Sequence, residues 1–262
     1  MTPYYTDEFV TLYCGNALEI MPTLASVDAI VTDPPYGITK LPWDRWPVGW
    51  LDFAAALTSQ LWCFGSLTMF LQRASEFAAW TLAQDVVWEK HNGSNMAGDR
   101  FRRVHELAVH WYRGAWDKLY KCMQVTYDAT ARHVRRKQRP PQWGDIDASA
   151  YVSEDGGPRQ MTSVIYARSC HGYAVNETQK PEGAVAPLVR FSVPVGGTCS
   201  IRSRDRAPRW WSRGELGCAR SASSSARNSA SWRSSASRSA SSPSIWAARH
   251  DLPVVRRRGA RA

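Results

Sequence analysis

The chain has 262 residues, of which 44% are hydrophobic, and this is enough to form one large domain or two small ones. Its 33 Lys and Arg residues outnumber the 23 Asp and Glu residues, but 14 of them are Arg residues after Thr198, where only three residues are acidic. The first 198 residues therefore hold 19 basic and 20 acidic side chains. The net charge of +10 belongs to the last segment and cannot serve as evidence that the first 198 residues bind nucleic acid.

Cysteine spacing and hydropathy exclude two further classes of protein. The six Cys residues form no CxxC pair and have no regular spacing, which is typical of a reducing cytosol and not of a disulfide-stabilised secreted domain. Met1–Val10 is polar and acidic, unlike a signal peptide, and no apolar run approaches membrane-spanning length. The sequence predicts a cytoplasmic protein with no membrane segment.

Apolar runs and turn residues alternate along much of the chain. Strand patterns cover residues 10–15, 27–32, 67–71, 85–89 and 105–112, and helix patterns cover residues 17–24, 51–64, 74–82 and 181–191. Strands separated by helices predict an α/β fold with a mostly parallel sheet.

The residues Asp33-Pro34-Pro35-Tyr36-Gly37 directly follow the buried strand pattern at 27–32. Proline cannot continue a strand ladder, so the strand must end at Thr32 or Asp33. Asp33 and Tyr36 are then placed at the carboxyl edge of the sheet, where ligands bind in open parallel sheets. A simple strand-ending turn is the alternative, but the order of the residues favours a functional site.

The segment 114–173 has weaker periodicity and collects basic and Pro residues, notably HVRRKQRPPQW at 133–143. We interpret it as an inserted module. Its basic side chains either contact phosphates or belong to an ordinary solvated loop. The candidates for phosphate contact are Arg135, Arg136, Lys137 and Arg139.

Two other groups of residues have competing interpretations. HELAVH at 105–110 imitates a zinc motif, but its histidines are five residues apart and would not share a face on a helix or on a strand, so no metal site is predicted. Trp43, Trp46 and Trp50 follow the Asp-Pro-Pro-Tyr motif and either help to hold a ligand or pack in the core.

Two motifs together resemble one enzyme family. TDPPYG at 32–37, followed much later by TQKP at 178–181, resembles the DNA amino-methyltransferases that modify adenine N6 or cytosine N4. The order of the motifs resembles the permuted class, in which the catalytic motif precedes the cofactor motif. RFRRVHELAVHWYRG at 100–114 and the segment from 178 to 198 add to the resemblance, which covers most of residues 9–198.

The resemblance implies a methyltransferase fold, S-adenosylmethionine as cofactor and double-stranded DNA as substrate, with direct methyl transfer to an exocyclic amine. It assigns the amine contacts to the Asp33 carboxylate and the Pro34 carbonyl, within a catalytic set of Asp33, Pro34, Pro35 and Tyr36. Tyr36 would stack on a base taken out of the duplex. The implied cofactor-binding residues are Asp33, Asn16, Thr178, Lys180 and Pro181, although relatives often carry Asp where this chain has Asn16.

The composition changes abruptly at Thr198, where the family pattern expects a strand and glycine loop of the type VLDPFAGSGTT. If one base was lost at Thr198, the original reading frame across the codons for residues 198–209 permits that sequence. We interpret residues 199–262 as a frameshifted tail, disordered by composition. The alternative is a genuine Ser/Arg tail that binds nucleic acid, but the tail has four Trp residues and no Lys, which favours the frameshift.

These interpretations divide the chain into four parts: a catalytic α/β portion at 1–113, a target-recognition-like insertion at 114–175, the TQKP helix region at 176–198 and the tail at 199–262. Without the glycine loop we expect an incomplete sheet, an open edge on the strand that ends at Asp33, and weak or no cofactor binding. The predicted function is adenine-N6 methylation of DNA. Cytosine-N4 methylation and a non-catalytic nucleic-acid-binding remnant are the alternatives, and a restriction nuclease partner stays open.

Overall fold

The computed structural model describes residues 2–94, 98–136, 149–170, 172, 174, 179–203 and 219–223. The chain divides into two compact units. The first unit consists of Met1–Cys122 and Thr162–Trp232, and the described residues of the second are 123–136 and 149–161.

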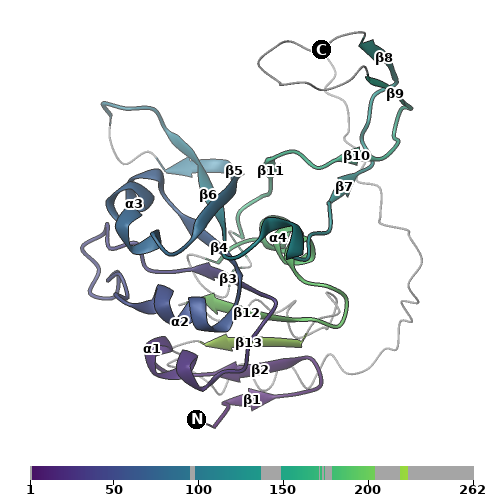
Figure 1. Ribbon diagram of the computed structural model, residues 1–262. Helices are drawn as coiled ribbons and strands as arrows, with labels where there is room; N and C mark the ends of the chain where they lie inside the picture. Colours follow the sequence, from purple (N-terminus) through teal and green to yellow (C-terminus); the bar gives the residue numbers. More distant parts are fainter. Residues whose placement is uncertain are drawn as a thin grey trace. The chain divides into compact units, whose positions relative to one another are not determined.

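Nine strands of the first unit form one sheet with the order β1-β2-β13-β12-β3-β4-β6-β5-β11 (Figure 1). In this order the strands are Tyr5–Thr6, Val10–Tyr13, Ala219–Ser223, Thr198–Ser203, Ala29–Asp33, Gln60–Gly65, Arg103–Tyr112, Thr81–Ser94 and Val164–Tyr166. The strands from β2 to β4 are all parallel, β6 is antiparallel to both of its neighbours, and β11 is parallel to β5. The predicted α/β fold with a mostly parallel sheet is confirmed.

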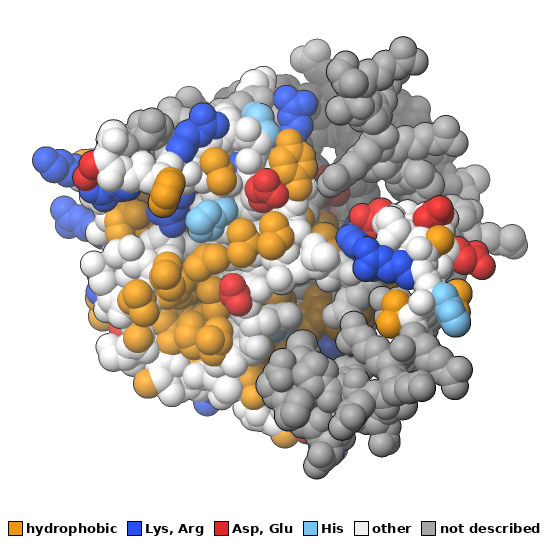
Figure 2. Space-filling view, turned by 90° about the horizontal axis from the view of Figure 1, so that it is seen from above, with side chains coloured by type: hydrophobic (Ala, Val, Ile, Leu, Met, Phe, Trp, Pro, Cys, Tyr) orange, Lys and Arg blue, Asp and Glu red, His pale blue; other side chains and the backbone are white. Residues whose placement is uncertain are grey.

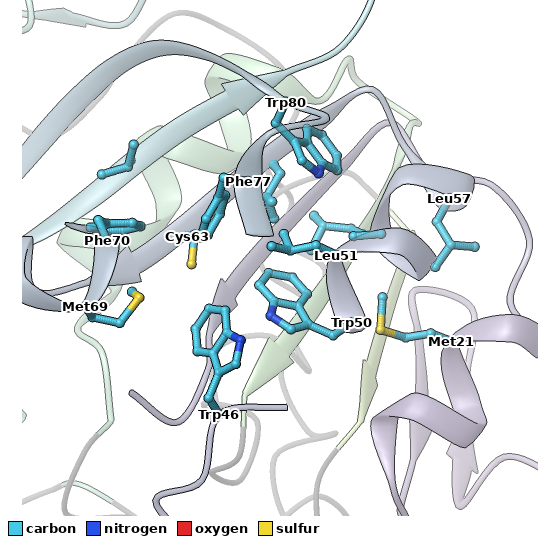
Figure 3. Close-up of a cluster of buried hydrophobic side chains, with 14 residues drawn as sticks. Met21, Trp46, Trp50, Leu51, Leu57, Cys63, Met69, Phe70, Phe77 and Trp80 are labelled. Carbon is cyan, nitrogen blue, oxygen red and sulfur yellow. The ribbon is translucent and has the colours of Figure 1, made fainter. Parts of the chain in front are cut away.

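Helices cover both faces of this sheet. Side chains alternate along each buried strand, so Val31 of β3 and Trp62 of β4 face α4, whereas Ile30 and Leu61 face the opposite layer. That opposite layer is an aromatic-rich cluster (Figure 3). The helices and single turns are α1 Ala17–Ile20, η1 Met21–Thr23, α2 Trp50–Leu57, α3 Leu67–Gln72, η2 Ala74–Phe77, η3 Trp116–Lys118 and α4 Glu182–Ser192. None of the helices described is long and apolar enough to cross a bilayer.

The predictions for residues 51–71 were partly wrong. The expected helix at 51–64 ends at Leu57, and Gln60–Gly65 is instead the fully buried strand β4. The expected strand at 67–71 is the helix α3, because the Ser66 hydroxyl accepts a hydrogen bond from the Met69 amide at 3.1 Å and caps its first turn. A continuous apolar run suits a buried helix and a buried strand equally well, so periodicity could not separate them.

The expectation of an open edge beside Asp33 was also wrong. β12 pairs with β3 in parallel, from Cys199 opposite Ala29 to Ser203 opposite Asp33, and β13 fills the space between β12 and β2. Cys199 and Ile201 supply apolar side chains to the core on the α4 face, which makes this segment compatible with a central strand. Strands therefore occur within the predicted tail at 199–203 and 219–223.

The second unit contains two short antiparallel pairs, β7 Val125–Thr126 with β10 Arg159–Gln160, and β8 Arg132–Arg136 with β9 Ser149–Ser153. Arg135 and Arg136 are on β8, and their side chains lie outside the described structure. Lys137 and Arg139 lie wholly outside the described residues. The phosphate contacts predicted for these four residues stay predictions.

His110 of β6 is a fully buried polar side chain in the core of the first unit. Its ring stacks on Trp62 with centroids 4.3 Å apart, and neither ring nitrogen has a hydrogen-bond partner among the described residues. Burial, together with the nearby charge of Lys121, lowers the pKa of His110 from 6.5 to about 4. The core therefore holds this imidazole in its neutral form.

We expect the protein to lose stability as the pH falls from 6.5 towards 4, because the unfolded chain binds a proton at His110 that the folded chain excludes. The expected slope from this group is about 1.4 kcal/mol per pH unit. His110→Phe should raise the free energy of unfolding by about 1 kcal/mol at pH 7 and by more at pH 5, measured by urea unfolding. His105→Gln, at an exposed position on the same strand, is the control. An unchanged pH slope in His110→Phe would contradict this explanation.

Candidate active site

The Asp-Pro-Pro-Tyr motif lies at the carboxyl edge of the sheet, as predicted from the sequence. β3 ends at Asp33, and the two prolines that follow cannot continue its ladder of hydrogen bonds. β12 and β13 run in the same direction as β3, so their carboxyl ends meet at the same edge (Figure 1). This edge is where loops from several parallel strands can surround a ligand.

Both carboxylate oxygens of Asp33 accept a hydrogen bond. The Tyr36 hydroxyl donates to Oδ1 at 2.8 Å, and the Lys180 ammonium donates to Oδ2 at 2.6 Å. The two ends of the ion pair are largely buried, with 15% of the Asp33 side chain and 12% of the Lys180 side chain exposed. Each carboxylate oxygen has a second lone pair, so Asp33 keeps the capacity to accept further hydrogen bonds from a ligand.

Lys180 also contacts a second carboxylate. Its ammonium lies 3.2 Å from Glu106 Oε2, although that oxygen accepts no hydrogen bond of good geometry in this structure. Glu106 Oε1 accepts a hydrogen bond from Lys90 at 2.5 Å. Lys90, Glu106, Lys180 and Asp33 thus form a line of alternating charges, which we call the charge row. Its two positive and two negative groups balance, which lowers the cost of burying them.

The charge row shifts the protonation equilibria of its members. Burial opposes ionisation of Glu106, but the ammonium groups of Lys180 and Lys90 outweigh it and lower the pKa of Glu106 to about 2. Burial likewise opposes the charge on Lys180, yet Asp33 and Glu106 raise its pKa above the usual range. Burial and the neighbouring carboxylates raise the pKa of Tyr36 well above its ordinary value, so Tyr36 stays a hydrogen-bond donor at neutral pH.

The structure brings together part of the predicted site. Pro34 is buried, and Pro181 directly precedes α4, with its carbonyl accepting hydrogen bonds from that helix, so these residues position Asp33 and Lys180. Asn16 caps α1 and accepts a hydrogen bond from the Leu18 amide at 3.1 Å. It follows β2, which ends at the same sheet edge, but β13 and β12 separate β2 from β3. Thr178 lies outside the described residues.

The three tryptophans after the motif have different environments. Trp46 and Trp50 are buried in the cluster shown in Figure 3, and the Trp46 indole donates a hydrogen bond to Glu76 at 2.6 Å. Trp43 is 39% exposed, in the loop between β3 and α2. Trp46 and Trp50 therefore pack in the core, whereas Trp43 is partly exposed.

Sequence reasoning missed Glu106 and Lys90. Gly65, the last residue of β4, is opposite Leu107 of β6. Glu106 is the neighbour of Leu107 on β6 and therefore lies just past the carboxyl end of β4. The one signal in the sequence was an acidic residue just before an apolar strand run, ELAVHWY. It could be connected to Asp33 only through the antiparallel pairing of β6 with β4 and β5.

Glu106→Gln is expected to lower the free energy of unfolding by about 3 kcal/mol at pH 7, because Lys90 and Lys180, two largely buried ammonium groups, would lose the carboxylate that both contact. The pKa of Glu106 is lowered by folding, so its contribution is full above pH 4.5 and fades as the pH falls towards 2. Urea unfolding at pH 7 and pH 3 measures both values. The difference between the parent and the variant should shrink at pH 3.

Glu89→Gln is the matched control, since Glu89 is exposed on the neighbouring strand β5. Its expected effect is below about 0.5 kcal/mol at either pH. A loss for Glu106→Gln that is equal at pH 7 and pH 3 would show that shape, and not charge, makes Glu106 important.

Comparison with known proteins agrees with this geometry. Residues 27–200, more than half of the chain, match the family described as DNA methylase, of the N6 and N4 type. No curated protein sequence matches the chain. Among solved structures, it is similar to M1.HpyAVI at 12% identity and a TM-score of 0.54, covering 88% of this chain and 98% of that chain.

Two further solved structures are similar to this chain. The M1.HpyAVI-SAM complex has 16% identity and a TM-score of 0.54, with 88% of this chain and 99% of that chain covered. The PvuII DNA methyltransferase, described as cytosine-N4-specific, has 12% identity and a TM-score of 0.55, with 86% and 84% covered. At these identities the likenesses show a shared fold.

Proposed function

This chain belongs to the DNA methylase family whose model spans residues 27–200, and from that premise we propose that its site transfers a methyl group from S-adenosylmethionine to the N6 amine of adenine in double-stranded DNA. One observation carries the proposal: Lys180 reaches across 147 residues of sequence to bind the Asp33 carboxylate at the carboxyl edge of the sheet. The two motifs of the sequence thereby form one site.

The proposed role of Asp33 follows from the chemistry of the substrate. An exocyclic amine is a poor nucleophile because its lone pair is delocalised into the ring. A carboxylate that accepts hydrogen bonds from the amine draws the lone pair out of conjugation, and the second lone pair on each Asp33 oxygen is suited to this. The Pro34 carbonyl directly follows Asp33 and is the proposed second acceptor. Lys180 and Tyr36 fix the carboxylate so that it need not reorganise when the amine binds.

Tyr36 has a second proposed role. Its hydroxyl is fixed on Asp33 at 2.8 Å, and its ring is packed in part against the aromatic cluster on the α2 face. Methylation requires the base to leave the duplex, and an aromatic ring beside the acceptor carboxylate can replace the stacking that the base loses. A flipped base stacked on the Tyr36 ring would have its amine near the Asp33 carboxylate and the Pro34 carbonyl.

Adenine is preferred over cytosine because the motif begins with Asp33, where many cytosine-N4 enzymes carry Ser. The Asp33 carboxylate offers two oxygens and a full negative charge to the amine. This arrangement suits the amine of adenine and the amine of cytosine equally. The product therefore has to be identified chemically.

Only one part of the proposed cofactor site has residues that suit S-adenosylmethionine in the chain as written. S-adenosylmethionine supplies an electrophilic methyl group when bound, and Asp33, Lys180 and Pro181 are in place at the edge where it would lie. The segment that joins β12 to β13, residues 204–218, should form a glycine-rich turn that lets the backbone approach the ligand. Its sequence, RDRAPRWWSRGELGC, places bulky and charged residues there, so it does not fit.

We propose that this mismatch results from the loss of one base at Thr198. The place of β12 supports the proposal, since the frame that permits VLDPFAGSGTT would put an apolar strand at the same central position beside β3. The chain as written is then expected to have the amine-binding half of the site without the loop that holds the methyl donor. A non-catalytic remnant that binds nucleic acid is the competing proposal for this chain.

The test uses the chain with the reading frame restored at Thr198, incubated with methyl-labelled S-adenosylmethionine and DNA of mixed sequence. After digestion, the labelled nucleosides are separated and identified by mass spectrometry. The expected product is N6-methyladenine. N4-methylcytosine would replace the adenine proposal with the cytosine one, and no labelled nucleoside from a folded, cofactor-binding protein would overturn both.

A further inference from the structure

The β5–β6 hairpin projects from the carboxyl edge of the sheet (Figure 1). β5 runs parallel to β4 because both are antiparallel to β6, so the end of β5 and the start of β6 lie at the edge where β3 ends. The described residues of the turn are Gly98–Arg102, and Arg103 begins β6. We call Gly98–Arg103 the hairpin tip.

The hairpin tip combines one exposed aromatic ring with exposed positive charge. Phe101 has a relative exposure of 101%, so its ring contacts essentially nothing in the protein. Arg100 forms a two-point ion pair with Asp99 at 2.8 and 2.9 Å, which neutralises its charge. Arg102 and Arg103 are exposed, and neither forms an ion pair with any residue that the structure describes.

This concentration of charge is local. The first 198 residues carry 19 basic and 20 acidic side chains, so the average surface of that part is not basic. Figure 2 shows Lys and Arg side chains gathered at the left margin, the side on which the hairpin projects in Figure 1. A single exposed apolar residue is ordinary on a protein surface, but it is unusual to find an aromatic ring beside two exposed guanidinium groups that pair with no described residue, at the sheet edge where Asp33 lies.

We propose that the hairpin tip is a DNA-contacting element beside the active site, with Arg102 and Arg103 on backbone phosphates and Phe101 against the bases. The inference rests on the proposed function, since it takes DNA as the polyanion. Guanidinium groups bind phosphate oxygens, and an apolar wedge between base steps lowers the cost of unstacking a neighbouring base. The tip would thus help to open the duplex next to the base that Asp33 and Tyr36 receive. None of the residues earlier predicted to bind DNA belongs to this tip.

The experiment measures binding of the full chain to a fluorescein-labelled 30-bp duplex of mixed sequence, by anisotropy between 50 and 200 mM salt. Two lost phosphate contacts should reduce the slope of log K against log salt by about 2, so Arg102→Gln/Arg103→Gln should bind more weakly with a shallower slope. Phe101→Ala should bind about tenfold more weakly with an unchanged slope, and Phe101→Trp should recover the affinity.

The matched control is Lys118→Gln/Arg190→Gln, which removes two exposed charges at the opposite edge of the sheet and should leave the slope unchanged. All replaced side chains are exposed, and equal thermal melting of the variants checks that each is folded. A slope for Arg102→Gln/Arg103→Gln equal to that of the parent would overturn the proposal. An unchanged affinity of Phe101→Ala would overturn the contact with bases.

Measurements of DNA binding and of methyl transfer distinguish failure of the hairpin-tip proposal from failure of the proposed function. If the frame-restored chain methylates DNA and the tip variants bind as the parent does, the inference fails and the proposed function stands. If the slope changes as expected and no methyl transfer occurs, the tip binds DNA and the proposed function fails. An acidic polypeptide used as competitor tests whether the tip prefers DNA. If the tip variants lose binding to this polypeptide as much as they lose binding to DNA, the tip binds polyanions in general, and the proposed contact of Phe101 with bases is overturned.

Discussion

Asp33→Asn in the frame-restored chain is expected to lower the rate of methyl transfer by roughly 10³-fold, the scale at which removal of one preorganised electrostatic group acts in other enzymes. The amide has nearly the shape of the carboxylate and can still accept the Tyr36 hydroxyl. It lacks the negative charge and one of the two acceptor oxygens, so it can neither pair with Lys180 nor hold both the ammonium and the substrate amine.

Radiolabel transfer to DNA under single-turnover conditions measures this rate. Asp85→Asn is the control, since Asp85 is exposed on β5 away from the motif. Transfer by Asp33→Asn within about tenfold of the parent, in a protein of unchanged melting temperature, would remove Asp33 from the reaction.

Lys180→Met is expected to affect both activity and stability. It leaves Asp33 and Glu106 as two largely buried carboxylates without their shared cation, which should lower the free energy of unfolding by about 3 kcal/mol at pH 7. Methyl transfer by the frame-restored chain should fall by about 10²-fold, because Asp33 loses the contact that fixes its orientation. Lys180 is thus a positioning residue.

A double variant separates charge from packing. Lys180→Met/Glu106→Gln removes one positive and one negative charge, so its destabilisation should be smaller than the sum of the two single effects by about 1–3 kcal/mol. Lys180→Arg, which keeps the charge, should recover part of the stability. Urea unfolding and the single-turnover assay measure the two properties. Additive losses in the double variant would contradict the charge row as a coupled unit.

The positions of Asp33 and Tyr36 were predictable from the sequence because two prolines fix where a buried strand must end. The resemblance assigned Asp33 and Lys180 to the cofactor site, but it did not predict the contact between them, which the structure shows. Glu106 was read as part of a false zinc motif, since its role depends on which strand lies beside β4, and a strand pattern does not contain that information.

Residues 51–71 and 198–203 show two other limits of sequence analysis. In the first, a long apolar run hid the change from helix to strand that follows Leu57. In the second, the Ser and Arg content predicted disorder, yet the alternation of Cys199 and Ile201 with polar residues is sufficient for a strand between two others. The composition of a segment is an average over its residues, whereas the pairing of a strand with its neighbours depends on a few apolar positions such as Cys199 and Ile201.

The most direct test of the central claim compares methyl transfer to DNA by two proteins, the chain as written and the chain with one base restored at the Thr198 codon. The account predicts that the restored chain forms N6-methyladenine and that the chain as written forms no methylated nucleoside at the same protein concentration. Methylation by the chain as written at a comparable rate would contradict the frameshift, and a restored chain that binds S-adenosylmethionine but leaves DNA unmodified would contradict the proposed function.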